Sequence, residues 1–338
     1  MRKLASIQTI RALTPIEGAD AIETAAVLGW QLVVKKGEFS VGDKAVYCEI
    51  DCLMPDKPEF EFLKPRGMRV RTIRLRGQIS QGICFPLSIL PADAPTDEDT
   101  DVTELLGIIK HEPPIPACLS GIMKGNFPSF IPKTDETRVQ VLQSVLNHYA
   151  GEPCFVTEKL DGSSATYFIN NDEFGVCSRN MQLEENAENS FWKIANTLEI
   201  ESKLRTIGKN IALQGELVGE GIQGNKLKLK GQMVYFFNAY DIDKAEPLSP
   251  DDFEALLKTL ELPIVPILET AYLLDNDIDT IVKKSVIKSR LCPDVFAEGI
   301  IIRPYRYDPN LRLPGGLFNN TRVSFKAINP EFLLKFGE

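Results

Sequence analysis

The sequence predicts an α+β protein in which a small N-terminal β-barrel precedes a larger domain of antiparallel-rich sheets with flanking helices. The chain has 338 residues, enough for two domains, and 43% of them are apolar. Short strand-like runs separated by turn residues fill the first part of the chain. Beyond residue 133 such runs alternate with helical stripes, which indicates mixed secondary structure.

The first predicted domain, residues 1–110, has an all-β pattern. Its apolar runs have strand length, and they cover residues 30–34, 45–50, 70–75 and 82–87. Such runs suit a small closed barrel, so we expect an OB-fold.

Residues 111–132 are expected to form a linker, because the acidic segment 93–101 and the prolines at 113–116 interrupt regular structure. Residues 133–338 form the second predicted domain. Asp135 and Glu136 are placed to favour a helix N-terminus, Ser249 is a predicted helix cap, and a further helix is expected over 189–207. One helical stripe consists of Leu142, Val145, Leu146 and Tyr149. Predicted strands cover 154–159, 165–169, 211–218, 234–240, 300–303 and 322–328.

The composition excludes several classes of protein. No apolar run reaches the length of a membrane span, and the N-terminus lacks the apolar stretch of a signal peptide. We therefore expect a cytoplasmic or otherwise intracellular protein with no membrane partner. The seven cysteines form no Cys-x-x-Cys pair and are expected to be reduced, buried thiols. The two histidines, His111 and His148, lack the spaced neighbours of a zinc site.

The formal net charge of −9 argues against a protein coated in positive charge, but nucleic-acid binding needs only a local basic face. Basic residues gather in three segments of the chain: Arg66, Arg69, Arg71, Arg74 and Arg76; Lys226, Lys228 and Lys230; and Arg303, Arg306, Arg312, Arg322 and Lys326. Each segment is a candidate phosphate-binding face, and the alternative is a solvated face without a partner.

A lysine between a strand and a turn is the most informative feature of the sequence. Residues 157–164 read Thr-Glu-Lys-Leu-Asp-Gly-Ser-Ser, so Lys159 has a carboxylate, Asp161, two residues on. Further motifs follow in order: Ser178-Arg179-Asn180, Gln214-Gly215-Glu216-Leu217, residues 235–241, Glu298-Gly299 with residues 300–303, and Ser324-Phe325-Lys326-Ala327. In order and spacing these segments resemble the six motifs of the DNA ligase, RNA ligase and capping-enzyme superfamily. The resemblance implies a covalent nucleotidyltransferase with an ATP-grasp-like ligase fold.

A lysine amine that attacks the α-phosphorus of ATP must be neutral. At a pKa near 10.4, deprotonation at pH 7 costs about 4–5 kcal/mol. Asp161 alone would favour the ammonium form, so a divalent cation and the charges of Lys326 and Arg303 are needed to reverse the local field. We therefore expect Mg²⁺ or Mn²⁺, held by Asp161, Glu216 and Glu298 directly or through water. Ordinary surface acids are the alternative for each carboxylate.

The resemblance implies a role for each matching residue. Lys159 is the nucleophile that forms lysyl-AMP, and Lys326 binds the α-phosphate and stabilises its transition-state charge. The other residues that would contact the nucleotide are Glu158 at the adenine edge, Arg179 on the ribose or on RNA, Glu216 near the ribose, Phe237 stacked on adenine, and Glu298. Ser324 departs from the pattern, because many relatives carry a lysine there. Phosphate binding is then weaker, or Arg322 compensates.

The faces of the predicted strand 234–240 leave one assignment open. Strict alternation places Tyr235, Phe237 and Ala239 on one face and Phe236 on the other. The competing interpretation therefore makes Phe236 the pocket wall and Phe237 a core residue.

The order of the domains separates the members of the superfamily. DNA ligases and capping enzymes carry their OB module after the last motif, and the bacteriophage-type RNA ligases carry a helical C-terminal domain. Here the OB module comes first and only twelve residues follow Lys326. This order, and the lead-in at residues 130–140, resemble the Deinococcus- and Naegleria-type RNA ligases over essentially the whole chain.

That resemblance implies an ATP-dependent RNA ligase that seals 3′-hydroxyl and 5′-phosphate ends, at nicks in duplexes with an RNA 3′-hydroxyl strand, through lysyl-AMP and RNA-adenylate. We also expect a monomer. The alternatives are a DNA ligase, a GTP-dependent capping enzyme, and an OB protein that binds nucleic acid and carries an inactive nucleotidyltransferase domain.

Overall fold

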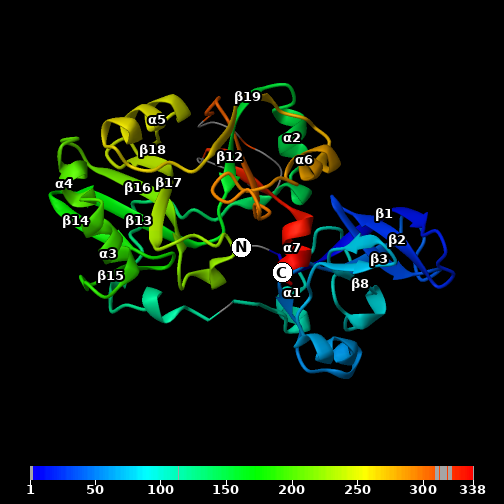
Figure 1. The fold of residues 1–338 in the computed structure, drawn as a ribbon. Helices are drawn as coiled ribbons and strands as arrows, with labels where there is room; N and C mark the ends of the chain where they lie inside the picture. The colour runs from blue at the N-terminus through cyan, green and yellow to red at the C-terminus, as the bar shows by residue number, and fades with distance from the viewer. Residues whose placement is uncertain (1–2, 113, 309–311, 313–317, 319–321, 338) are drawn as a thin grey trace. The chain divides into compact units, whose positions relative to one another are not determined.

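The structure is a computed structural model that describes residues 3–112, 114–308, 312, 318 and 322–337 (Figure 1). The chain divides into two compact units, one of Met1–Pro113 with Pro330–Glu338 and the other of Pro114–Asn329. The C-terminal helix α7 (Pro330–Phe336) thus groups with the N-terminal unit, whereas its residues were expected in the second domain. The boundaries at residues 110 and 133 stay predictions.

The first unit is built on a curled antiparallel sheet in the order β3-β2-β1-β4-β8. Its strands are β1 (Ala5–Pro15), β2 (Ile22–Val27), β3 (Trp30–Lys35), β4 (Lys44–Cys48) and β8 (Ile83–Pro86). The first half of β1 pairs with β4 and the second half with β2, with a bulge between Ile10 and Ala12. Because a bulge bends its strand, one long strand serves both halves of the curled sheet.

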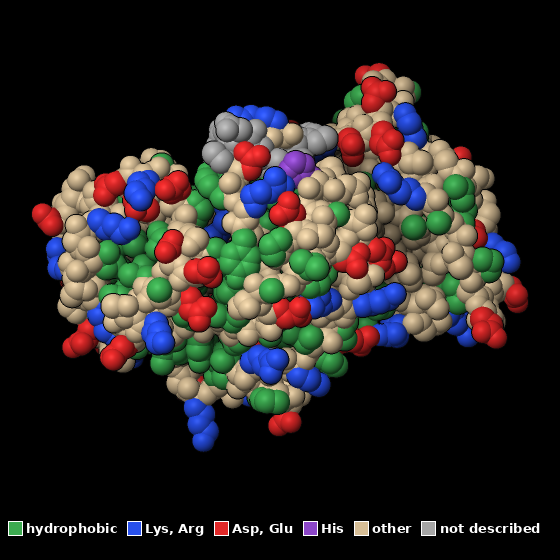
Figure 2. All heavy atoms as spheres, turned by 90° about the horizontal axis from the view of Figure 1, so that it is seen from above, with side chains coloured by type: hydrophobic (Ala, Val, Ile, Leu, Met, Phe, Trp, Pro, Cys, Tyr) green, Lys and Arg blue, Asp and Glu red, His purple; other side chains and the backbone are tan. Residues whose placement is uncertain are grey.

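Short elements complete this unit: β5 (Cys52–Leu53), η1 (Pro58–Arg66), β6 (Ile73–Leu75), β7 (Gln78–Ser80), η2 (Leu87–Ile89), α1 (Thr103–Leu106) and β9 (Ile109–Lys110). The predicted arginine segment is only partly available to a ligand. Arg69 pairs with Asp51 at 3.0 Å, and Arg74 pairs with Glu331 of α7 at 2.7 Å. On the face drawn in Figure 2, basic and acidic side chains are interspersed, which is typical of a solvated surface.

Two sheets form the second unit, and all their strand pairs are antiparallel except β11 with β21. The seven-stranded sheet runs β10 (Met123–Asn126), β15 (Met181–Leu183), β14 (Glu173–Cys177), β13 (Ser163–Asn170), β16 (Ile211–Gly219), β17 (Gln232–Asp241), β18 (Glu246–Pro247). The five-stranded sheet runs β11 (Thr137–Arg138), β21 (Phe325–Ile328), β20 (Gly299–Pro304), β12 (Pro153–Lys159), β19 (Ile267–Leu273). The predicted antiparallel-rich α+β architecture is confirmed.

Helices flank both sheets: η3 (Ala117–Leu119), η4 (Val139–Val141), α2 (Gln143–His148), α3 (Ser190–Thr197), α4 (Ile200–Arg205), η5 (Gln223–Asn225), α5 (Pro250–Thr259) and α6 (Ile278–Lys284). Figure 1 shows α3 and α4 beside the seven-stranded sheet and α2 and α6 beside β12 and β19. Among the described residues, no helix combines the length and the apolar character that crossing a membrane requires.

The helix predictions hold in part. The residues of the predicted stripe at 142–149 are fully buried, and Ser249 accepts a hydrogen bond from the amide of Asp252, as expected for a helix cap. The helix expected over 189–207 is instead two helices, because Glu199 between α3 and α4 adopts a left-handed conformation with φ 52°. Glu136 precedes the strand β11 and caps no helix, so that prediction was wrong.

A β-bulge in β17 changes which residues share a face. Gln214 pairs with Asn238, but the next residue, Gly215, pairs with Phe236, so Phe237 is the extra residue. As a result Ala239 is fully buried, as Phe236 is, whereas Phe237 is only half-buried. The strict alternation expected from the sequence was wrong from this point on, because alternation assumes an uninterrupted ladder.

Candidate functional site

The turn after β12 places Lys159 at the end of a strand and Asp161 in the connection to β13. Gly162 follows, and there is no space for a larger residue. A Cβ at this position would lie 2.4 Å from the carbonyl oxygen of Leu217 and 2.8 Å from a methyl group of Val218. The Lys-x-Asp-Gly sequence therefore needs its glycine because β16 approaches the turn closely.

Strand pairing brings three distant parts of the chain to this turn. Lys159 pairs with Gly299 across β12 and β20, and Ser164 pairs with Glu216 across β13 and β16. The Nζ atom of Lys159 lies 2.6 Å from Oε2 of Glu298, and the two side chains are 21% and 14% exposed. This contact is a charge-assisted hydrogen bond shielded from solvent on most sides.

The charges around Lys159 set its protonation. Burial alone would lower the pKa of Lys159, but the charges of Glu298 and Glu216, the hydrogen bond to Glu298 and the charge of Asp161 outweigh it, so the pKa is raised. The protein alone thus holds the amine as an ammonium ion. This agrees with the expectation that an added positive charge must reverse the local field before the amine can attack.

The pKa of Glu216 is raised as well, but by burial rather than in spite of it. Burial and the charges of Glu298 and Asp161 together raise its pKa to about 8, against the opposing effects of Lys159 and Arg179. Three carboxyl groups therefore surround one lysine, and the raised pKa favours the protonated form of Glu216 at neutral pH. A bound cation would favour its ionised form.

The carboxylates fit a hard divalent cation in chemistry, since all their donors are oxygen. They are not arranged as a finished cage: within the described part of the chain no three acidic, cysteine or histidine side chains converge on one metal position. Asp161 is occupied by Lys226, whose Nζ lies 3.2 Å from its carboxylate oxygens. A cation that takes one or two carboxylates and completes its shell with phosphate oxygens and waters suits this arrangement.

The pKa of Glu216 predicts a pH dependence of stability. Its folded pKa, about 8, lies above the unfolded value of 4.5, so its contribution to stability is complete below pH 4.5 and is lost as the pH rises through 8. Without metal, the wild type is expected to lose more of its thermal stability between about pH 6 and pH 9 than Glu216→Gln. Each kcal/mol lost lowers the melting temperature by about 2–4 °C.

Thermal melts in chelator and in Mn²⁺ check this prediction. Mn²⁺ is expected to restore the stability of the wild type at the higher pH and to have less effect on Glu216→Gln. Equal pH profiles for the two proteins in chelator would contradict the assignment.

Glu158, next to the lysine, is buried, with 1% of its surface exposed. Its Oε2 atom accepts a hydrogen bond from the backbone amide of Arg290 at 2.8 Å, while Oε1 is buried and has no hydrogen-bond partner among the residues that the structure describes. Burial raises the pKa of Glu158 against the effect of hydrogen bonds from Ser289 and Arg290. A buried acceptor without a donor is costly unless a ligand supplies one.

The aromatic residues of β17 divide between the core and the site. Phe236 is fully buried and packs edge-on against Tyr167, with ring centroids 6.0 Å apart. Phe237 packs beside the cluster that contains Leu160, and the guanidinium of Arg303 lies 5.7 Å from its ring centre. The interpretation with Phe237 in the core and Phe236 on the pocket wall was therefore wrong.

Ser324 forms hydrogen bonds with both Glu136 and Arg303. Its hydroxyl donates to Glu136 at 2.7 Å and accepts from Nε of Arg303 at 2.9 Å, and Arg303 also lies 3.3 Å from Glu136. Arg303 is 4% exposed, so this network is buried. The place of Glu136 in this network was not predicted from the sequence. One signal for it is the absence of a lysine at 324, which leaves room for a buried arginine–acid pair.

Arg322 belongs to a second network. It donates to Asn238 at 2.8 Å, Asn238 donates to Gln214 at 2.7 Å, and Gln214 donates to the carbonyl of Pro132 at 2.8 Å. Burial and the charge of Arg303 lower the pKa of Arg322 to about 9, against the effect of Glu136. This network joins β16 and β17 to the segments that precede β11 and β21.

Lys326 lies on β21, between β20 and β11, where it pairs with Ile301 of β20 and with Arg138 of β11. Arg179 lies in the bend between β14 and β15 and forms a 2.5 Å ion pair with Asp135, at 50% exposure. Its charge opposes the raised pKa of Glu216, which places it near the acids. The structure thus gathers Lys159, Glu298, Glu216 and Asp161 directly, and Arg179 pairs with a loop acid instead.

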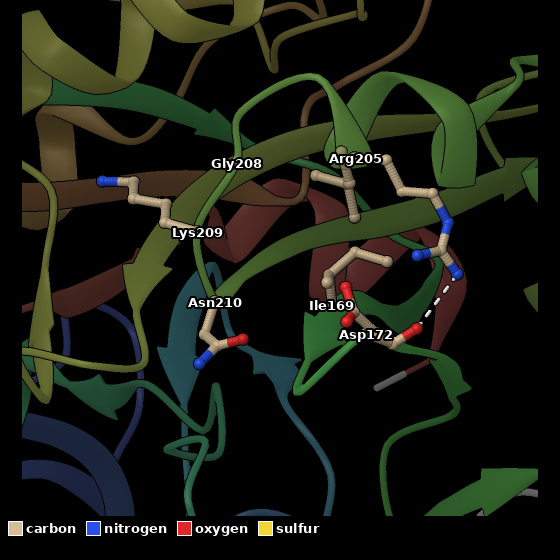
Figure 3. A pocket seen from close by; sticks show the side chains of 7 residues that line it. Ile169, Asp172, Arg205, Gly208, Lys209 and Asn210 are labelled. Carbon is tan, nitrogen blue, oxygen red and sulfur yellow. Dashed lines mark hydrogen bonds between the residues drawn. The ribbon is translucent and has the colours of Figure 1, made fainter.

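A hollow of about 170 Å³ lies elsewhere in the second unit (Figure 3). It is lined by Ile169, Asp172, Leu204, Arg205, Gly208, Lys209 and Asn210. In Figure 3 Arg205 reaches toward Asp172, whose carbonyl accepts its hydrogen bond at 3.0 Å. Ser164 pairs with Glu216 of the candidate site, and Ile169 lies five residues further along β13. The hollow and the site are thus about 17 Å apart along this strand. This hollow contains none of the predicted site residues.

Comparison with known proteins agrees with this geometry. A family model described as an OB-fold domain matches residues 4–87, and one described as RNA ligase matches residues 152–328. No curated protein gives a significant sequence match. Among solved structures, a Naegleria gruberi RNA ligase mutant in its apo form is 41% identical, with a TM-score of 0.88 over 98% of this chain and 97% of that chain.

Two further structures of that enzyme are equally similar. A mutant with ATP and Mn is 41% identical, with a TM-score of 0.90 over 100% of both chains, and the enzyme with PPi is 41% identical, with a TM-score of 0.89 over 98% of both chains. The predicted OB-fold and the ligase fold are confirmed by these matches. With its motif lysine held among three carboxylates and its similarity spanning both units, the chain belongs to the RNA ligase family.

Proposed function

We propose that this RNA ligase seals breaks between a 3′-hydroxyl and a 5′-phosphate, at nicks in duplexes that carry an RNA 3′-hydroxyl strand, through lysyl-AMP and RNA-adenylate. The observation that carries the proposal is the 2.6 Å contact of Lys159 with Glu298, inside a cluster that also holds Glu216 and Asp161. A buried lysine whose protonation depends on an added cation suits a nucleophile that is activated only when substrate and metal arrive.

The reaction has three steps. The neutral Nζ of Lys159 attacks the α-phosphorus of ATP, a phosphoramide bond forms and pyrophosphate leaves. An oxygen of the RNA 5′-phosphate then attacks the same phosphorus, so that AMP moves to the RNA and the lysine is released. Finally the 3′-hydroxyl attacks the phosphorus of the 5′-phosphate, and AMP leaves with its bonding electron pair.

We assign ATP and Mg²⁺ or Mn²⁺ as cofactors, in keeping with the Naegleria gruberi structures described with ATP and Mn. Asp161, Glu216 and Glu298 would hold the metal together with phosphate oxygens. When bound, the metal supplies positive charge that favours the neutral amine and stabilises the phosphates. Lys326 would contact the α-phosphate, and Arg179 the ribose or the RNA once it leaves Asp135.

The adenine pocket is assigned to Glu158 and Phe237. The buried Oε1 of Glu158 can accept a hydrogen bond from the exocyclic amino group of adenine, which guanine replaces with an acceptor oxygen. Phe237 presents a half-buried ring beside Arg303 for stacking. Recognition of ATP over GTP then depends on one carboxylate.

Glu158→Gln is expected to weaken this discrimination. The amide can donate to the guanine oxygen as well as accept from adenine, so the preference for ATP over GTP in lysyl-nucleotide formation should fall about 10-fold or more. Initial rates with α-labelled ATP and GTP measure the ratio, with Glu152→Gln as a control of the same chemistry outside the site. An unchanged ratio would remove Glu158 from the adenine pocket.

Ligation of nicked duplexes tests the whole proposal. Duplexes with RNA or DNA on each side of the nick are incubated with the wild type, ATP and Mn²⁺, and sealed strands and adenylated 5′ ends are separated by electrophoresis. Sealing that requires a ribonucleotide 3′-hydroxyl is expected. Equal sealing of all-DNA nicks would favour the DNA ligase alternative, label from GTP alone would favour a capping enzyme, and RNA binding without any covalent nucleotide would favour an inactive domain.

The proposal also covers the domain boundaries, the oligomeric state and the cellular location of the protein. We assign residues 1–110 to the OB domain, residues 111–132 to a linker and residues 133–338 to the catalytic domain. We also propose a monomer that works in the cytoplasm or another intracellular compartment.

A further inference from the structure

The connection between β16 and β17 carries three lysines that the proposed chemistry does not use. We name residues 220–231 the lysine loop, after Lys226, Lys228 and Lys230. Leu227 and Leu229 alternate with these lysines. Leu227 is buried and Leu229 half-buried, whereas Lys228 and Lys230 are exposed. The loop therefore has an apolar side that packs on the protein and a cationic side that faces solvent.

Two contacts hold the lysine loop against the turn that follows Lys159. Leu227 belongs to a buried cluster with Leu160, the residue directly after Lys159. Lys226 places its Nζ 3.2 Å from the carboxylate of Asp161, and both side chains are largely buried, at 15% and 12% exposure. The inner end of the loop is thus positioned against the catalytic turn by packing and by charge.

The backbone of the lysine loop is folded back on itself rather than extended. The side chain of Asn225 donates to the carbonyl of Leu229 at 2.9 Å and accepts from its amide at 3.0 Å. Gln223, Asn225 and Lys228 have φ values of 45°, 46° and 54°, a left-handed conformation that costs free energy for residues other than glycine. Such strain persists only where the surrounding contacts fix the loop, and it is concentrated at functional sites.

The exposed lysines stand out in an acidic protein. Among the described residues, neither Lys228 nor Lys230 forms an ion pair, whereas Lys226 pairs with Asp161. With a net charge of −9 over the whole chain, such local cations determine where a polyanion can bind. The lysine loop therefore places positive charges in a row, from Lys226 at the catalytic turn to Lys228 and Lys230 at the surface.

We propose that the lysine loop binds the phosphodiester backbone of the RNA strand that accepts AMP, next to its 5′-phosphate, through Lys228 and Lys230. The proposal rests on the proposed function and adds an interaction surface to it. Cationic contacts to phosphates position a strand without reading its sequence. The loop then presents the 5′-phosphate to the lysyl-AMP formed on Lys159, and the packing of Leu227 with Leu160 keeps the loop aligned with the turn.

The test compares Lys228→Gln/Lys230→Gln with a control that loses the same charge, Lys193→Gln/Lys258→Gln, on exposed positions of α3 and α5. Binding of 5′-phosphorylated single-stranded RNA is followed by fluorescence anisotropy between about 50 and 200 mM salt. Two lost phosphate contacts should reduce the slope of log K against log salt by about 1.4. The control pair should keep the wild-type slope, and Lys228→Arg/Lys230→Arg should restore it.

The second measurement compares the rate of AMP transfer to RNA with the rate of lysyl-AMP formation. AMP transfer from preformed lysyl-AMP to the same RNA is expected to fall at least 10-fold more than lysyl-AMP formation in the loop variant. Equal slopes and equal transfer rates for the loop and control variants would overturn the proposal. A wild type that forms no lysyl-AMP would refute the proposed function instead, and the anisotropy slopes would still decide the role of the loop. Matched DNA strands and nicked duplexes distinguish a general phosphate track from one specific to RNA.

Discussion

Replacing Lys159 with arginine is expected to abolish lysyl-AMP formation while keeping the charge balance of the site. Arginine is never neutral in proteins and cannot act as the attacking amine, but its guanidinium can still pair with Glu298. Loss of a nucleophile removes the covalent path entirely, so labelled protein should fall by a factor of about 10⁴ or more, to the background of the assay.

Lys159→Ala should lose the same activity and also perturb the folded state. Without the ammonium, Glu298 faces Glu216 and Asp161 with no countercharge from the lysine. Breaking a buried ion pair by removing one partner costs about 3–5 kcal/mol, and the 14–21% exposure of this pair reduces that figure. The alanine variant should therefore melt at a lower temperature than the arginine variant.

The measurement is incubation with α-labelled ATP and Mn²⁺, followed by denaturing electrophoresis and acid treatment of the labelled band. Lys193→Ala, an exposed lysine of α3, is the control and should label like the wild type. A labelled band of normal intensity in Lys159→Arg would show that another residue is the nucleophile.

Lys326→Ala is expected to have the second largest effect. A cation on the α-phosphate acts most strongly on the charge that develops as pyrophosphate leaves, and removal of one such group costs about 10²–10³ in rate. The loss should appear in the single-turnover rate of lysyl-AMP formation at saturating ATP rather than only in the ATP concentration needed for half-maximal rate.

Lys326→Arg separates charge from geometry. Because β21 is held between β20 and β11, the side chain cannot shift along the strand to compensate for a larger head group. A partial rescue of the rate is expected. Lys288→Ala, outside the catalytic cluster, serves as the control, and an alanine variant at 326 with a wild-type single-turnover rate would show that Lys326 does not contact the reacting phosphate.

Much of the fold was predictable because burial on a strand leaves a clear period in the sequence. The strands that end at Lys159 and that contain Glu216 appeared where expected, and family resemblance identified their carboxylates as partners. The division of 189–207 into two helices was not predictable, because it depends on a left-handed Glu199 that has no residue-type signal. The bulge at Phe237 was equally hidden, since alternation alone cannot reveal an unpaired residue.

The site was predicted less completely than the fold. Lys226 was grouped with a basic segment, and its pairing with Asp161 follows from the folding back of the lysine loop, which depends on Asn225 and on the packing of Leu227. Glu136 was assigned to a helix end, but its partner Arg303 lies more than 160 residues later. Side-chain contacts over such separations leave no local pattern.

The hydrogen-bond series Arg322–Asn238–Gln214–Pro132 carbonyl bears on how the second unit responds to a nucleotide. The Arg322–Asn238 bond ties the segment before β21 to the seven-stranded sheet, and the Gln214–Pro132 bond ties that sheet to the segment before β11. A motion that separates the two sheets would therefore break hydrogen bonds of largely buried groups. Rearrangement is cheaper in individual side chains, such as an arginine exchanging one acid for a phosphate. We therefore expect the two sheets to keep their arrangement when a nucleotide binds, and the unit to adapt through side-chain rotamers and loops.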